Sequence, residues 1–133
     1  MATTPIYFTT PGVANVQVTA ANASVATYTT GQQVLVGTAS GRRISRVRVA
    51  HAIDAAPSSN KVSFWISTDN GTTKRFVCDV LLGTPGASSA TVRVGYAEVP
   101  ELVGKVLFGT TNILYATSWI AQAANIDVEY NDA

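Results

Sequence analysis

The side chains best able to catalyse a reaction or bind a metal are scarce in this sequence. His51 is the only histidine and Cys78 the only cysteine among 133 residues. One imidazole and one thiol cannot complete a structural zinc site, which needs a full tetrahedral set of such ligands. Asp54 follows His51 closely, yet no Gly-x-Ser-x-Gly turn is present to expose a serine nucleophile beside them. We therefore expect no metal site, no cofactor and no nucleophilic catalysis.

Paired carboxylates are the next candidates, because two of them at a controlled separation can cleave glycosidic bonds. Glu98 and Glu101 flank a Val-Pro pair, and Asp127 and Glu129 share the outward side of an expected strand. Carboxylates on the outer face of a strand are ordinarily solvated rather than enclosed in a cleft. The sequence therefore predicts a protein that is not an enzyme.

Two arginines match two of these carboxylates in spacing. Arg46 and Arg48 are two residues apart, as are Asp127 and Glu129. The four side chains could pair across neighbouring strands of one sheet, or form complementary stripes on adjoining subunits. Exposed ion pairs are each worth only ~0–1 kcal/mol, so they would set the register of a contact rather than hold it together.

Apolar side chains would supply most of the adhesion in such a contact, at ~25 cal/mol per Å² buried. Trp65 has the spacing of an outward-facing residue, although it could instead pack beneath a second layer. A short apolar patch also lies near the start of the chain. The residues expected in a protein interface are Ile6, Tyr7, Phe8, Arg46, Arg48, Trp65, Asp127 and Glu129.

The elements that must position these residues are strands. In the segment 42–53, Val47, Val49, His51 and Ile53 fall on one side of an extended chain, and the two arginines fall on the other. His51 is expected at the end of this core row, hydrogen-bonded to a loop carbonyl. The pattern predicts a strand with one buried face and one exposed face.

A hairpin is the strongest local signal. An Asn70-Gly71 pair, which tolerates the positive φ angles of a tight turn, separates two strand-like segments. The inward residues are expected to be Val62, Phe64, Ile66, Phe76, Cys78, Val80 and Leu82, and the outward ones Trp65, Arg75, Val77, Asp79 and Leu81. In its inward row, Cys78 behaves as a small buried hydrophobe.

Ten short strands separated by turn-forming residues predict an all-β fold, an antiparallel sandwich or jelly roll. Residues 1–12, interrupted by Pro5 and Pro11, are expected to form an extended N-terminal arm, and residues 13–133 a single domain. The expected strands cover 14–19, 24–29, 33–37, 44–53, 61–67, 73–82, 90–99, 105–108, 113–119 and 126–130.

The composition limits the partners. Charged residues make up 13% of the chain, against about 25% in a typical soluble domain. The shortage fits a subunit of an assembly, or a soluble domain whose hydroxyl groups meet the solvent. A net charge of +1 gives no field that would attract nucleic acid, and neither a signal peptide nor a bilayer-spanning apolar run is expected.

An aromatic platform for sugars is a further alternative, since several rings are available. The available rings are Tyr96, Tyr115, Trp119 and Tyr130. Tyr115 and Trp119 share the spacing of Ile113, and Tyr130 shares that of Ile126. Shared spacing with aliphatic residues favours packing in the core over display on a binding surface.

The order of three segments resembles small β-sandwich virion proteins of tailed bacteriophages. These segments are Arg43 to Ala50, the hairpin FWISTDNGTTKRFVCDVLL, and the final ILYATSWIAQAANIDVEYNDA. The resemblance covers about residues 33 to 133. The chain departs from the Gly-Gly-Asp ending that is common in that group, because it closes on Tyr130-Asn131-Asp132-Ala133.

The resemblance implies a capsid decoration, or cement, protein that binds the major capsid protein and stabilises the shell. Such proteins are commonly homotrimers on the capsid surface, made in the host cytoplasm. A tail or head-to-tail connector component is the alternative within the same particle. A carbohydrate-binding module for host attachment is the alternative from a different class.

Overall fold

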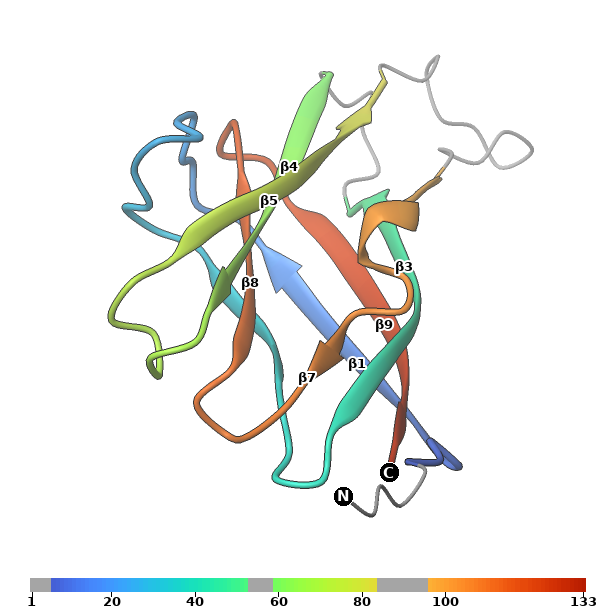
Figure 1. Cartoon of the computed structure of the whole chain (residues 1–133). Coiled ribbons are helices and arrows are strands. Elements are labelled where there is room, and N and C mark those ends of the chain that lie inside the picture. The colour runs from blue at the N-terminus through green and yellow to red at the C-terminus, as the bar shows by residue number, and fades with distance from the viewer. Residues whose placement is uncertain (1–5, 53–58, 84–95) are drawn as a thin grey trace, which may run out of the picture.

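The computed structural model describes residues 6–52, 59–83 and 96–133, and these residues form two antiparallel sheets that pack face to face (Figure 1). Apart from one turn of 3-10 helix, η1 (Pro100–Leu102), the regular structure described is all strand. The all-β sandwich expected from the sequence is confirmed. Residues 1–5 of the expected arm lie outside the described residues, as do Ile53 and Asp54.

The first sheet contains five strands and the second contains four. In the first sheet the order is β1 (Thr10–Val18), β9 (Ala124–Asp132), β3 (Arg42–His51) and β6 (Tyr96–Glu98), with β7 (Val106–Leu107) also paired to β3. In the second sheet the order is β2 (Gln32–Val36), β8 (Ile113–Ser118), β4 (Asn60–Ser67) and β5 (Arg75–Leu82).

Alternating side chains fill the space between the two sheets. Val47 and Val49 are fully buried, as their spacing predicts, and Ile126 and Val128 on the neighbouring β9 face the same core. The other fully buried core residues include Val18, Ile44, Val62, Phe64, Leu102 and Leu114. Ile44 and Val47 both point inward because a register shift lies between them, at the pairing of Ile44 and Arg46 with β9.

The predicted hairpin is present between β4 and β5. Asn70 has φ 59° and Gly71 has φ 89°, which are the left-handed conformations that a tight turn requires. The Asp69 carboxylate accepts hydrogen bonds from the Ser67 hydroxyl at 2.7 Å and from the Thr73 amide at 2.8 Å. These bonds lower the pKa of Asp69 to about 2, with the amide of Thr73 as the largest cause.

One register shift within the hairpin corrects the predicted rows of β5. Phe64 pairs with Cys78 but Trp65 pairs with Phe76, so Val77 is the extra residue of a bulge. Phe76 therefore lies beside Trp65 on the outer face, whereas Val77 packs against the core. Both residues were expected on the opposite face.

One expected strand is absent from the structure, and another is described only in part. The segment 24–29 belongs to a loop that runs from Thr19 to Gly31, rather than to a strand. In the segment 90–99, Tyr96–Glu98 is a strand and residues 90–95 lie outside the described part of the chain. The arm is also shorter than expected, because β1 begins at Thr10 and pairs with β9 from there.

Candidate functional site

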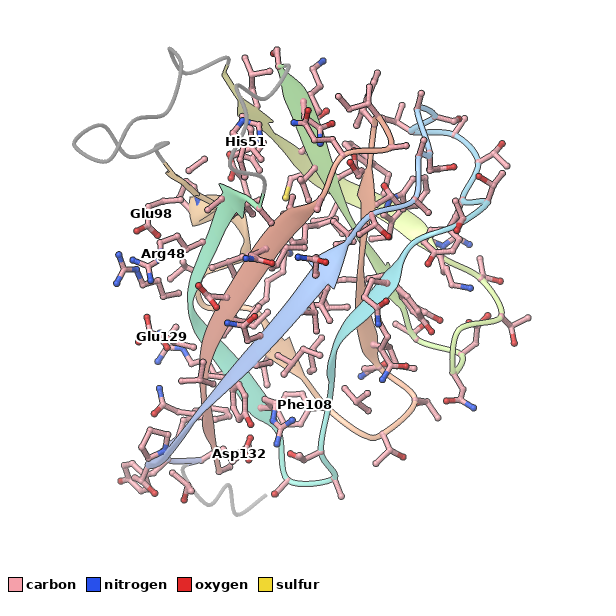
Figure 2. All side chains as sticks on the ribbon, turned by 180° about the vertical axis from the view of Figure 1, so that it is seen from behind. Arg48, His51, Glu98, Phe108, Glu129 and Asp132 are labelled. Atoms are coloured by element: carbon pink, nitrogen blue, oxygen red, sulfur yellow. The ribbon has the colours of Figure 1, made fainter. Side chains whose placement is uncertain are left out.

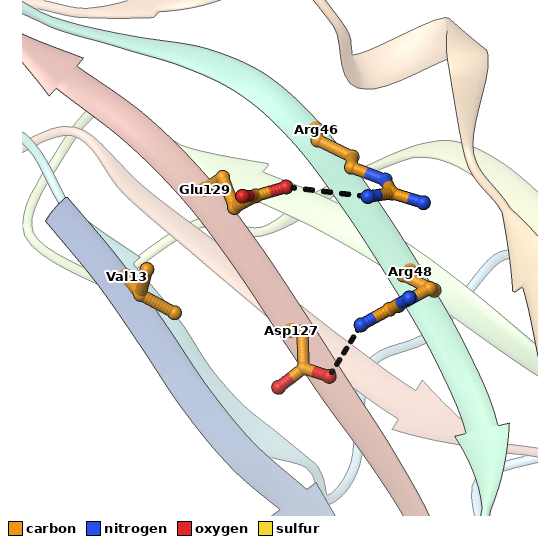
Figure 3. A pocket seen from close by; sticks show the side chains of 5 residues that line it. All are labelled: Val13, Arg46, Arg48, Asp127 and Glu129. Carbon is orange, nitrogen blue, oxygen red and sulfur yellow. Dashed lines mark ion pairs between the residues drawn. The ribbon is translucent and has the colours of Figure 1, made fainter. Parts of the chain in front are cut away.

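The two arginines and two carboxylates of matching spacing meet on the outer face of the first sheet (Figure 3). In the register of β3 and β9, Arg46 lies opposite Glu129 and Arg48 opposite Asp127. The closest nitrogen and oxygen atoms are 3.7 Å apart in the first pair and 3.9 Å apart in the second. Of the two arrangements left open by the sequence, the structure has the cross-strand one.

Glu98 on β6 is a third carboxylate in this group, which the spacing analysis did not place there. Arg46 donates from Nε and Nη2 to Glu98 Oε1, at 3.0 and 2.6 Å. This hydrogen bonding holds the pKa of Glu98 below its ordinary value. We call Arg46, Arg48, Glu98, Asp127 and Glu129 the charged face; Figure 2 shows Arg48, Glu98 and Glu129 along one side of the first sheet.

Polar side chains of β1 extend the charged face toward the edge of the sheet. Asn15 donates to Asp127 at 2.5 Å, and Gln17 donates to Asn125 at 3.1 Å. Val13, 66% exposed, lies beside them and completes a shallow hollow of about 220 Å³. Pockets that enclose a small molecule are usually larger, from ~300 Å³. The charged face is therefore a self-paired surface rather than a ligand pocket.

The N-terminal apolar residues lie at the end of the sandwich where the described chain begins and ends (Figure 1). Ile6 is 53% exposed and Tyr7 is 70% exposed. Phe8 is partly buried, and its ring and that of Phe108 both lie against Gly41. Phe108 remains 47% exposed and lies toward the same end as Asp132 (Figure 2). We call Ile6, Tyr7, Phe8 and Phe108 the apolar end.

Trp65 does not belong to an exposed surface, so its place among the expected interface residues is corrected. Its side chain is 1% exposed, and its indole nitrogen donates to the Thr117 hydroxyl at 3.0 Å. Tyr28, from the loop between β1 and β2, covers it edge-to-face with ring centroids 5.6 Å apart. Trp65 thus fills a second apolar layer, the alternative that its spacing left open.

The aromatic rings of the second sheet pack on one another instead of forming an open platform. Tyr28 also contacts Tyr115, with centroids 5.7 Å apart, and Lys74 lies over both rings. Burial and the neighbouring Tyr115 raise the pKa of Tyr28. Tyr115 therefore lies on the outer face of the second sheet, contrary to the core position that its spacing favoured. Trp119 donates to Ser63 at 2.8 Å beneath the Lys61 ammonium.

His51 makes the hydrogen bond to a loop carbonyl that the sequence predicted. Its Nε2 is 3.0 Å from the Gly83 carbonyl oxygen, and its Nδ1 is 3.1 Å from the Gln122 amide nitrogen. A neutral ring that donates from Nε2 and accepts at Nδ1 satisfies both contacts. His51 thereby links the ends of β3 and β5 to the loop between β8 and β9.

Cys78 is partly buried against the core, as expected of a small hydrophobe. Burial, with smaller contributions from Glu101 and Asp79, raises the pKa of its thiol to about 11. A thiol with so high a pKa is almost fully protonated at neutral pH and is a poor nucleophile.

One ion pair that the sequence analysis missed ties the two ends of the first sheet's central strands together. Arg42 donates to Asp132 from Nε at 2.6 Å and from Nη2 at 2.9 Å. Its guanidinium also lies 4.1 Å from the centre of the Tyr130 ring. Arg42 and Asp132 are not among the equally spaced charges that indicated the charged face, so the charge pattern gave no signal for this pair.

Within the described residues, no group of three or more His, Cys, Asp and Glu side chains is arranged to hold a metal ion. In the same part of the chain, no helix has the length and apolarity needed to cross a membrane. No protein-family model, curated protein or solved structure matches the chain.

Proposed function

We propose that this chain is a capsid decoration protein, which binds the major capsid protein on the virion surface of a tailed bacteriophage and stabilises the shell. The resemblance of its hairpin and final strands to small virion proteins supports this role. So does the low charged fraction of 13%, because a protein whose surface is partly covered in an assembly needs fewer charges to stay dispersed.

The observation that carries the proposal is the apolar end. Ile6 and Tyr7 are adjacent in the chain, and they are 53% and 70% exposed. Contiguous exposed apolar side chains on a folded domain mark surfaces that bind another protein. Burying them against a capsid subunit gains ~25 cal/mol per Å², which is the main adhesive term available on this surface.

The charged face has a secondary role in this proposal. Arg46 and Arg48 are paired with carboxylates of their own chain, so a partner would have to compete with those contacts. Exposed pairs of this kind add little affinity but disfavour a misaligned partner. The charged face would therefore set the orientation of the subunit after the apolar end has docked.

Many equivalent contacts on one capsid explain how a protein with a small contact area can stay bound. A decoration protein occupies many equivalent positions on a symmetric lattice, and a self-associated subunit contacts that lattice at more than one point. A subunit attached at several points rebinds before it leaves, so avidity exceeds the affinity of each contact. The proposal thus requires only a modest apolar contact from each copy.

The test is attachment to purified particles of the phage whose genome carries the gene. We expect mass spectrometry to find the chain in virions and cryo-microscopy to place it on the capsid. The double variant Ile6→Ser, Tyr7→Ser should bind stripped shells at least tenfold more weakly, while the control Val25→Ser, another exposed apolar residue on a distant loop, should bind normally. Density in the tail or neck, or equal binding of the two variants, would contradict the proposal.

A further inference from the structure

The outer edge of the first sheet is long and uncharged. β1 pairs with β9 on one side, and no strand of the described residues pairs with it on the other. Its nine residues, TPGVANVQV, include no charged side chain, and their pairing with β9 runs from Thr10 to Val18 without a shift. An edge strand presents unpaired backbone N–H and C=O groups, so a regular one is a template for another strand.

The other edges of the sandwich are short or irregular. Within the described part of the chain β6 has three residues, and β2 is shifted in register between Gln33 and Leu35. β5 is bulged at Val77 and also carries Arg75 and Asp79. Bulges, charges and short length are the usual devices that keep sheet edges from pairing with other chains. Only Pro11, near one end, gives β1 a comparable feature.

The side chains of β1 also leave apolar surface open at this edge. Ala14 and Val16 pack against the core but are only partly buried. Val13, on the opposite face, is 66% exposed. A strand added beside β1 would cover all three side chains and satisfy the outward backbone groups at the same time.

We propose that the strand occupying this edge is β1 of a second copy of the chain, in antiparallel pairing centred on Ala14. That centre pairs all nine residues of both strands. On the core side, Ala14 pairs with Ala14 of the other copy, and the small Gly12 pairs with the larger Val16. On the outer side, Val13 pairs with Asn15.

Charge supports a second copy over another peptide. An uncharged strand offers nothing to select an acidic or a basic partner, whereas two identical uncharged strands meet without like-charge repulsion. The nearest charges, Asp127, Glu129 and Asp132, lie one strand inward on β9, and each is paired with an arginine of the same copy. The junction therefore joins two uncharged strands, and the charges beside it are already paired within their own copy.

Symmetry fixes the assembly that results. Antiparallel pairing of identical strands has a two-fold axis, so the contact closes on itself as a dimer. The first sheets of the two copies become one continuous sheet. The resemblance to phage proteins implied a trimer instead, and the two assemblies differ in mass.

The experiment combines mass with hydrogen exchange in the unmodified protein. Light scattering over a range of concentrations should approach twice the 13.9 kDa of one chain. About half of the amides of an edge strand point away from its neighbour, so the peptide covering residues 10–18 should exchange more slowly as the dimer forms. A monomer at all concentrations, a trimer, or exchange of residues 10–18 that does not change with association would overturn the proposal.

Disulfide formation tests the register. In a Cys78→Ser background, Ala14→Cys places two thiols on the axis, with Cβ atoms about 5 Å apart, and should yield a covalent dimer on mild oxidation. Gln17→Cys is the matched control, because two copies of that position would be about 20 Å apart. Equal cross-linking of the two variants, or none for Ala14→Cys in a protein that is dimeric by mass, would refute the pairing centred on Ala14. Since neither measurement involves a capsid, failure here leaves the proposed function standing.

Discussion

At the scale of single residues, the Arg42–Asp132 pair has the geometry of a stabilising ion pair. The side chains are 19% and 27% exposed, and the guanidinium contacts the carboxylate through two nitrogens. Planar, two-point contact costs less side-chain entropy per hydrogen bond than the longer Arg46–Glu129 and Arg48–Asp127 pairs of the charged face. This contact also joins the start of β3 to the end of β9, close to the apolar end.

The pH dependence of the stability that this pair contributes follows from the direction in which the pKa of Asp132 is shifted. The hydrogen bond from Arg42 lowers the pKa of Asp132 below its ordinary value of 3.8, so the stabilisation is present above that pH and is lost as acid protonates the folded carboxyl. Asp132→Asn should lower the free energy of unfolding by about 1 kcal/mol at neutral pH. In urea titrations the difference from wild type should shrink below about pH 4.

Asp127→Asn is the matched control for that experiment. Its carboxylate is the more exposed, at 34%, and its contact with Arg48 is longer, at 3.9 Å. We therefore expect Asp127→Asn to lower the free energy of unfolding at neutral pH by less than Asp132→Asn does. Asp127→Asn could instead lower the free energy of unfolding as much as Asp132→Asn does, or the effect of Asp132→Asn could persist unchanged into acid. Either result would show that the two-point pair is not the source of the stability.

Cys78 should react slowly at ordinary pH. Burial raises the pKa of the thiol to about 11 from the 9.0 of a free cysteine, so little thiolate is present until strongly basic pH. The rate of alkylation by iodoacetamide in the folded protein should keep rising between about pH 9 and pH 11, with circular dichroism recorded alongside to show that the fold persists. A rate that levels off below pH 9 in folded protein would contradict the assignment.

At the scale of elements, the β4–β5 turn depends on a glycine for two separate reasons. Gly71 has φ 89°, and a Cβ atom placed on it would lie 2.5 Å from the Tyr115 hydroxyl oxygen. Gly104 also has φ 89°, but a Cβ atom there would meet nothing within 4 Å. Comparing alanine substitutions at Gly71 and Gly104 therefore separates the backbone cost of a positive φ from the cost of a steric clash.

We expect Gly104→Ala to cost about 1 kcal/mol of unfolding free energy, from the backbone alone. Gly71→Ala should cost more, because Tyr115 must also move away from Tyr28 and Lys74. Chemical denaturation of both variants measures the difference, and Gly71→Ala, Tyr115→Phe should recover part of it by removing the clashing oxygen. Equal losses for the two alanine variants would mean that Tyr115 yields without cost.

Alternation along the chain was enough to predict most of the sheet but not its irregularities. It placed Val47 and Val49 in the core and the two arginines outside, and Asn70-Gly71 located the hairpin. It failed at Phe76 and Val77, because a bulge adds one residue to a strand and reverses the faces beyond it. A bulge is fixed by contacts with the partner strand, which are not encoded in a two-residue period.

The residues of the candidate surfaces were likewise predicted only in part from the sequence. The pairing of Arg46 with Glu129 and of Arg48 with Asp127 followed from equal spacing, because antiparallel strands bring equally spaced residues into register. Trp65 was misplaced because alternation separates two faces but does not reveal that a loop covers one of them. Tyr28, which covers Trp65, lies in a segment that was expected to be a strand.

At the scale of the whole molecule, the boundary between arm and domain decides how the chain could bind a shell without losing its fold. The first strand pairing begins at Thr10, opposite Asp132, and the Thr9 amide also donates to the Asp132 carbonyl at 3.0 Å. Ile6 and Tyr7 precede these contacts and are largely exposed. Ile6 and Tyr7, which we propose to dock, are therefore different residues from those that hold β1 to β9, although the two groups lie next to each other in the sequence.

Two nested truncations test this boundary. Deleting residues 1–7 removes exposed apolar surface but no pairing of β1, so thermal unfolding should stay within a degree or so of wild type while attachment to shells is lost. Deleting residues 1–12 also removes three residues paired with β9, including Gly12, against which the Tyr130 ring packs. Each kcal/mol lost lowers the melting temperature of a domain this size by a few degrees, so calorimetry should resolve the second truncation clearly from the first. If the shorter truncation lowers the melting temperature as much as the longer one, the apolar end is part of the fold, and the surface that we propose for binding the capsid must lie elsewhere.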